Sequence, residues 1–334
     1  MTIIRSTRRV VLAAAASAFF GAFATTQALA QTAAAPKWPT QPVRFVVPFP
    51  AGSAPDVMVR VLGAKLQEKW GQAVVVDNRP GGSSATNITN VMSSPTDGYT
   101  LAFAQGSALF VAPHTMKKVP YEFDRDFVPI GLVAVSPMLL LVPGDSPYKT
   151  VDEFIAAGRA GTNAIEIADN GPATLPHLTA ALLGLNGKAQ FLHVHYQGGA
   201  QAMQGTLSGQ TKAQVEPLVT VAGVVQSGRM KVLGSFGDKP EPGLENYPLV
   251  SAAAPGTVAH GWYAIVGRKG LDPAIVRKVN ADLNDALATP EVVNKYRELA
   301  AYPRPGTPAD LSKFLEQDSR KWQTVLERID FKPE

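Results

Sequence analysis

Small and polar residues recur where hydrophobic runs of this sequence end, and they could hold a small anion through backbone amides and hydroxyls. In the stretch FVVPFPAGSAPDVMVRVL, residues 45–62, Ala51, Gly52 and Ser53 separate a strand-like run from a helix-like one. Glycine lets the backbone approach a ligand closely, and free amides at a helix start attract negative charge. Ser53 and Asp56 have the spacing of a capping box, which would hold the charge of the acid. The alternative interpretation is an ordinary strand-to-helix turn.

Corners of the same kind follow four further strand candidates. They lie at residues 81–84, 105–107, 170–174 and 197–199. In open α/β sheets the carboxyl ends of the strands line the ligand crevice. We therefore predict a cleft rich in amides and hydroxyls, suited to a small carboxylate.

Catalytic and metal-binding patterns are weak by comparison. The sequence has no cysteine and no nucleophile elbow, P-loop, dinucleotide fingerprint or H-E-x-x-H pair. The five histidines are scattered except for His193 and His195, which would share one face of a strand. Two histidines need at least a third ligand to hold a metal, so a structural or solvent-facing role is favoured. We predict neither catalysis nor a bound metal or cofactor.

Two domains of α/β type must position these corners. About 300 residues exceed the size at which one core usually keeps growing, and β-rich runs alternate with helical patterns, as in parallel sheets with crossover helices. The expected strands are 43–47, 74–76, 99–103, 137–142, 164–168, 191–196, 232–236 and 262–266. Helices are expected between them, including 273–287 and 309–328 near the C-terminus.

The N-terminus predicts export. Arg5, Arg8 and Arg9 precede an apolar segment that ends in the triplet Ala28-Leu29-Ala30, the layout of a secretory signal cleaved after residue 30. The segment Ser6 to Leu12 also fits a twin-arginine signal loosely. Three of the formal +4 charges belong to this signal, so the mature chain is nearly neutral. A nearly neutral chain gives no electrostatic reason to expect binding to nucleic acid. The secretory signal predicts a periplasmic location.

Six segments of the chain, in order, carry a family resemblance. They are PFPAGSAPDVMVR, VVDNRPGGSSATN, SPTDGYTLAF, VPYEFDRDFVPIGLV, HVHYQGGAQAMQGTLSGQ and GWYAIVGRKGLDPAIVRKVN. They resemble the motifs of the substrate-binding receptors of tripartite tricarboxylate transporters, often called the Bug family. The similarity extends from residue 42 to about 325, so the chain is identified as a member.

The resemblance implies a two-lobed periplasmic binding protein of the flytrap type (type II), with a mixed, mainly parallel sheet in each lobe and helices on both faces. Lobe one would combine residues 31–137 with 262–334, and lobe two would be 138–261. Family ligands are mostly small carboxylates, held by amides, hydroxyls and waters. Carried over by motif, the ligand-binding residues are Phe49, Ala51, Gly52, Ser53, Gly81, Gly82, Ser83, Ser84, Gln105 and Ser107 in lobe one, and Asn170, Thr174, His177, Tyr196 and Gly198 in lobe two.

Departures from the family pattern concern the ligand. His195 stands where the family usually has proline, Gln197 where it has lysine, and Glu216 lies near a common aspartate position. The expected partners are the membrane components of a tripartite transporter, or alternatively a membrane sensor that reads the ligand. The chain is expected to act as a monomer.

Overall fold

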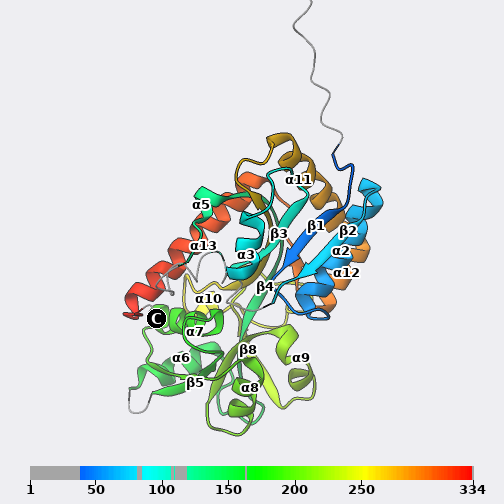
Figure 1. Ribbon diagram of the computed structural model, residues 1–334. Coiled ribbons are helices and arrows are strands. Elements are labelled where there is room, and N and C mark those ends of the chain that lie inside the picture. The colour runs from blue at the N-terminus through cyan, green and yellow to red at the C-terminus, as the bar shows by residue number, and fades with distance from the viewer. Residues whose placement is uncertain (1–37, 81–84, 107–108, 110–118, 162–163, 333–334) are drawn as a thin grey trace, which may run out of the picture. The chain divides into compact units, whose positions relative to one another are not determined.

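The computed structural model describes residues 38–80, 85–106, 109, 119–161 and 164–332 (Figure 1). The predicted signal peptide, residues 1–30, lies outside them. In the part of the chain that is described, no helix combines the length and the apolar character needed to cross a bilayer.

The first sheet has the strand order β2-β1-β3-β9-β4. Its strands are β1 (Val43–Val47), β2 (Val74–Asn78), β3 (Thr100–Gln105), β9 (His260–Arg268) and the first part of β4 (Phe127–Pro143). β1 is parallel to β2 and β3, whereas β9 is antiparallel to β3 and β4. β1 is apolar at four of its five positions and largely buried, because elements pack on both faces of its sheet.

Strand β4 leaves the first sheet and enters the second. It pairs with β9 from Phe127 to Pro137 and with β7 and β8 from Met138 to Pro143. The sequence predicted only residues 137–142 of this strand. The earlier part was missed because Pro129, Gly131 and two register shifts against β9 interrupt the hydrophobic pattern.

The second sheet continues from β4 through β7 (Ala213–Pro217) and β5 (Ile165–Asp169) to β6 (Phe191–His195), with β8 (Met230–Ser235) also paired to β4. β5 is parallel to β6 and β7. The strand β7 was not predicted. The predicted set of strand-end corners therefore lacks the corner at Glu216 and Pro217.

Helices connect these strands. Their bounds are α2 (Ala54–Trp70), α3 (Ala85–Met92), α5 (Phe123–Asp126), α6 (Val151–Arg159), α7 (Leu175–Gly187), α8 (Gly199–Leu207), α9 (Leu218–Gln226), α10 (Val250–Ala253), α11 (Pro273–Leu287), α12 (Pro290–Glu298) and α13 (Pro308–Arg328), and the short strand β10 (Tyr302–Pro303) pairs with β4. The predicted helix 273–287 is confirmed residue for residue. Gly71 ends α2 at φ 62°, in the left-handed region expected of a C-terminal cap.

The last helix packs into two hydrophobic cores. Leu311 and Leu315 belong to the buried cluster that contains Val46 and Trp262. Trp322, Val325 and Leu326 belong to the cluster built around the second sheet. α13 also contacts both β4 and α7. The C-terminal helix therefore ties the two sheets together, in addition to the crossing of β4.

Candidate functional site

A cavity of about 620 Å³ is lined by elements of both sheets. The first sheet and its helices contribute Ala54, Pro55 and Met58 from α2, Gln105 and Gly106 after β3, and His260 to Tyr263 from β9. The second contributes Asn170, residues 172–176, and Glu216, Pro217 and Val219 around the end of β7.

Three helices begin at this cavity. Ala54 opens α2, Leu175 opens α7, and Pro217 precedes the first residue of α9; all three line the cavity. The amino end of a helix carries partial positive charge and unpaired amides, which favour an anion. Of the predicted corners, those at residues 105–107 and 170–174 contribute to the cavity lining, the corner at residues 51–53 adjoins it through Ala54, and none of residues 197–199 lines it. The corner at residues 81–84 lies outside the described part of the chain, and the start of α9 is an addition.

The corner at residues 51–56 is held differently from the prediction. Ser53 is the N-cap of α2, but its hydroxyl donates to Pro50 O at 2.7 Å and does not cap the helix. The predicted capping box is therefore wrong. Asp56 instead accepts hydrogen bonds from the Gly52 amide at 2.8 Å and from Arg60 at 2.9 Å. Burial alone would raise the pKa of Asp56, but its hydrogen bonds lower it overall. The negative charge of Asp56 is thus compensated within the corner. The Gly52 amide donates to this carboxylate and is therefore not free to bind a ligand.

The corner after β5 is fixed by two buried side chains. Asp169 accepts from the Gly171 amide at 2.9 Å, and His177 Nδ1 accepts from the Ala173 amide at 2.9 Å. Ala173 has φ 55°, a left-handed conformation that costs a non-glycine residue about 1–2 kcal/mol. The hydrogen bond to His177 helps to hold that conformation. Asn170 and Thr174, on either side of it, are thereby presented to the cavity.

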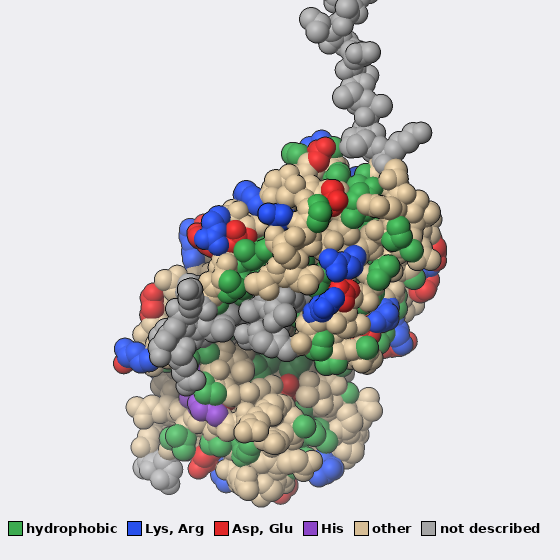
Figure 2. Space-filling model, viewed as in Figure 1, with side chains coloured by type: hydrophobic (Ala, Val, Ile, Leu, Met, Phe, Trp, Pro, Cys, Tyr) green, Lys and Arg blue, Asp and Glu red, His purple; other side chains and the backbone are tan. Residues whose placement is uncertain are grey.

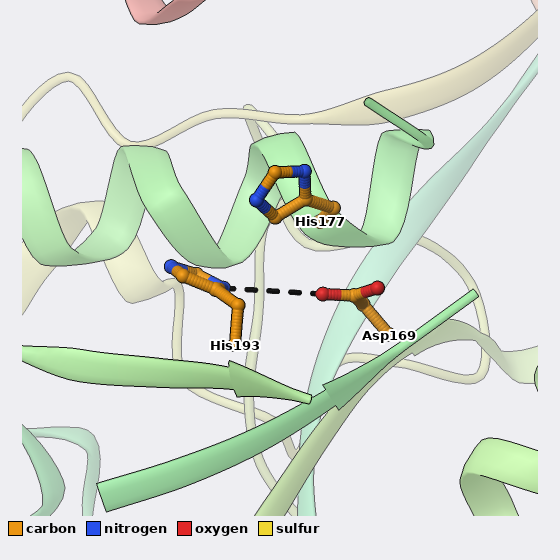
Figure 3. A group of neighbouring side chains, drawn as sticks. All are labelled: Asp169, His177 and His193. Carbon is orange, nitrogen blue, oxygen red and sulfur yellow. Dashed lines mark ion pairs between the residues drawn. The ribbon is translucent and has the colours of Figure 1, made fainter. Parts of the chain in front are cut away.

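Behind this corner, His177, His193 and His195 surround Asp169. The rings of His193 and His195 each lie 4.8 Å from that of His177, measured between centroids. His195 Nδ1 lies 2.8 Å from Asp169 Oδ1, and His193 Nδ1 lies 3.9 Å from Oδ2, the pair drawn in Figure 3. Figure 2 shows one patch of histidine atoms at the surface, in the lower part of the view. The expectation that the other histidines are scattered away from His193 and His195 is therefore wrong for His177.

Asp169, His177 and His193 are close enough to be considered as metal ligands, since candidate ligand atoms lie within 4.8 Å of one another. However, the Nδ1 atom of His177 accepts a hydrogen bond, so the proton of the neutral ring is on Nε2. A nitrogen must be unprotonated to bind a metal. Ligation by His177 would thus require the Ala173 amide to move. As arranged, His177 supports the cavity wall.

Burial keeps His177 and His193 neutral. It lowers the pKa of His177 to about 3 and that of His193 to about 4, with repulsion from neighbouring histidines adding to the effect. Burial also raises the pKa of Asp169, although the hydrogen bond from His195 opposes this. Protonation of His177 or His193 would therefore cost folding free energy, whereas protonation of Asp169 would not.

Glu216 is a buried acid on the cavity wall. It is 4% exposed, and Asn170 Nδ2 donates to its Oε1 at 3.2 Å. Burial raises the pKa of Glu216 to about 7, whereas hydrogen bonds with Asn170, Thr220 and Gln214 lower it. Among the residues that the structure describes, Glu216 Oε2 has no hydrogen-bond partner, nor have Asn170 Oδ1 and Gln214 Oε1. Three buried acceptors are left unsatisfied in one region.

Of the fifteen residues predicted from motifs, Gln105, Asn170 and Thr174 line the cavity. Phe49 lies against its wall, with its ring 5.8 Å from that of Tyr263. Tyr196 lies beside Gly205 of α8, and its hydroxyl donates to Gln210, beyond the end of that helix, at 3.2 Å. Gly198 caps the start of α8 at φ 108°. Ala51 belongs to the turn before α2, with Gly52 and Ser53. His177 lies outside the lining and holds the Ala173 amide. The other five predicted residues, Gly81, Gly82, Ser83, Ser84 and Ser107, lie outside the described part of the chain.

Sequence reasoning missed Glu216, His260, Trp262, Tyr263 and Asp318 as cavity residues. For Glu216 a signal existed, because AQVEPLV is a short strand followed by proline and a helix. Recognising β7 would have placed Glu216 at a strand end. Trp262 and Asp318 had no such signal, because their hydrogen bond, 2.8 Å from Nε1 to Oδ2, joins residues 56 positions apart.

Comparisons with known proteins agree with this architecture. Residues 58–331 match the model of the family described as "Tripartite tricarboxylate transporter family receptor". The chain is 32% identical, over 291 residues, to a Pseudomonas sp. (strain P51) protein described as "UPF0065 protein in tcbD-tcbE intergenic region", covering 86% of each sequence.

Two solved structures are similar over nearly their whole length. One is an R. palustris protein with adipate, at 26% identity and a TM-score of 0.75, covering 89% of this chain and all of that one. The other is MatC from Rhodopseudomonas palustris with bound malate, at 26% identity and a TM-score of 0.70, covering 86% of this chain and all of that one. These similarities confirm the predicted two-lobed α/β fold.

Proposed function

Because the chain belongs to the tripartite tricarboxylate transporter receptor family, we propose that it is a periplasmic receptor that captures a small carboxylate in the cavity between its two sheets. The observation that carries the proposal is the convergence of the amino ends of α2, α7 and α9 on one cavity of about 620 Å³. Adipate and malate in the two similar structures support the ligand class.

The lobes divide where β4 changes sheets. Its pairing with β9 ends at Pro137, and its pairing with the second sheet begins at Met138, which supports the boundary between residues 137 and 138. His260 begins β9 and returns the chain to the first sheet, close to the second boundary at 261 and 262. The end of α13 belongs to lobe two by its packing, because Trp322 lies in that core.

A binding experiment on a variant with a larger side chain in the cavity tests the proposed function. Ala54 lines the cavity at the start of α2, whereas Ala64 is exposed on the same helix. We expect calorimetry to detect binding of at least one acid from a panel of malate, adipate, succinate, L-aspartate and L-glutamate. Ala54→Phe should abolish that binding, and Ala64→Phe should retain it. Absence of binding by the whole panel, or equal binding by both variants, would refute the proposal.

Export and partners are tested separately. Intact-mass measurement of periplasmic protein should give a chain that starts at Gln31; a mature species that keeps residues 5–29 would contradict cleavage. Pull-down with the purified receptor should recover membrane components of a tripartite transporter, and recovery of a sensor protein instead would favour the alternative partner. The receptor should elute as a monomer in both ligand states.

A further inference from the structure

We infer that the ligand of this cavity carries an ammonium group as well as a carboxylate, and that Glu216 is the residue that binds the ammonium. The inference rests on the proposed function and narrows its ligand class to small zwitterionic acids. Glu216 would thereby act as a specificity-determining residue on the lobe-two side of the cavity.

The unsatisfied acceptors are the first argument. Glu216 Oε2 and Asn170 Oδ1 are buried and lack hydrogen-bond donors within the described part of the chain, and both residues line the cavity. Gln214 Oε1 is also buried without a hydrogen-bond donor among the described residues. Gln214 lies two residues before Glu216 on β7, so the two side chains are on the same face of the strand. A buried acceptor without a donor is costly. The groups missing at this wall are donors, which a ligand can supply and a simple carboxylate cannot.

The charge of the wall is the second argument. Among the described residues that line the cavity, there is no lysine or arginine, and the two acids are Glu216 and Asp318. Asp318 is already paired, since Lys321 Nζ lies 2.7 Å from its Oδ1. The side chains that hydrogen-bond to Glu216 are all neutral: the amides of Asn170 and Gln214 and the hydroxyl of Thr220. A buried charge needs an opposite charge to be stable, and a ligand ammonium is the matching group.

The two ends of such a ligand meet different surroundings. Its carboxylate would lie at the amino ends of helices α2 and α7, where amides and the helix dipole favour negative charge. Its ammonium would lie at the strand-end wall that holds Glu216 and Asn170. The competing arrangement is a protonated Glu216 that donates to a second carboxylate of a dianionic ligand. The two arrangements predict opposite preferences between matched acids.

Matched pairs of probes distinguish them. Succinate and L-aspartate differ by one ammonium group, as do glutarate and L-glutamate, and adipate and L-2-aminoadipate. Calorimetry at pH 8 should show that the amino acid of a pair binds at least about tenfold more tightly than its partner, as expected for a hydrogen bond between charged groups. Glu216→Gln should remove this preference by weakening the amino acid without weakening the plain acid.

Glu298→Gln serves as the matched control, because Glu298 is exposed on α12 and outside the cavity lining. This variant should keep the wild-type preference, and thermal unfolding should show that Glu216→Gln remains folded. Equal binding within every pair, tighter binding of the plain acids, or a preference that survives in Glu216→Gln would overturn the inference while leaving carboxylate capture intact. Failure of every probe to bind would refute the proposed function itself.

Discussion

The backbone amide of Ala173 donates a hydrogen bond to Nδ1 of His177 at 2.9 Å. The bond joins the strained corner after β5 to the first turn of α7, so a side chain outside the cavity lining determines the shape of the cavity wall. It also determines which ring nitrogen of His177 carries the proton.

Two replacements of His177 should distinguish the contribution of its hydrogen bond from the contribution of its ring. His177→Asn places an amide oxygen near the position of Nδ1, so it should keep the acceptor for Ala173 and retain binding of the acid identified by calorimetry. His177→Ala leaves a buried amide unpaired, which costs about 1–3 kcal/mol, and it should also weaken binding because Asn170 and Thr174 flank Ala173. Chemical denaturation and calorimetry measure the two effects. Equal loss of binding in both variants would show that the hydrogen bond is unimportant.

Stability should decrease in acid because of the buried histidines. In the unfolded chain His177 and His193 take up protons near pH 6.5, whereas in the folded chain burial lowers their pKa to about 3 and about 4. Below pH 6.5 the unfolded state binds more protons, so the free energy of unfolding falls as pH falls toward 4, by up to about 1.4 kcal/mol per pH unit for each histidine.

Glu216 acts in the opposite direction. Its pKa is raised from 4.5 to about 7, so it destabilises the folded chain as pH rises from 4.5 to 7. Denaturation of wild type, His177→Asn and Glu216→Gln between pH 4 and 8 resolves the contributions. His177→Asn should lose stability less steeply below pH 6.5 than wild type does. An unchanged slope would mean that His177 does not titrate as its burial requires.

A methyl group at Gly106 should disturb the cavity. A Cβ atom there would lie 2.7 Å from Trp262 Nε1, and Trp262 is a buried lining residue. We expect Gly106→Ala to destabilise the fold by about 1–3 kcal/mol, as overpacking does, and to weaken ligand binding. Gly223→Ala is the control, since a Cβ there meets nothing within 4 Å and the residue lies in α9; it should be stabilising by about 0.5–1 kcal/mol. Thermal unfolding compares the two.

Zinc should not bind tightly to the histidine cluster. The proton on Nε2 of His177 and the hydrogen bond between His195 and Asp169 both compete with a metal. Calorimetric titration of the chelator-treated protein with zinc should show no binding at micromolar concentration, and chelator should leave ligand binding unchanged. Tight binding that His193→Gln and His195→Gln each remove would establish the cluster as a metal site.

The sequence by itself determined the family, the α/β class and the corners that follow β1, β3 and β5. These features are local: the hydrophobic run at Val43–Val47, the small residues after it and the apolar face of α2 are all read within a few neighbouring residues. The same holds for Gly71, whose lack of a side chain suits the left-handed end of α2. Such signals can be recognised in the sequence because each depends only on backbone geometry within a few neighbouring residues.

Only the tertiary structure decided which groups meet. Asp169, His177 and His193 come from a strand, a helix and the neighbouring strand, and their contact depends on the parallel register of β5 and β6. Glu216 became an unsatisfied acid only because β7 buries it beside Asn170. Hydrogen bonding and burial depend on residues far apart in the chain, so neither the orientation of His177 nor the charge of the cavity wall could be derived from residue spacing.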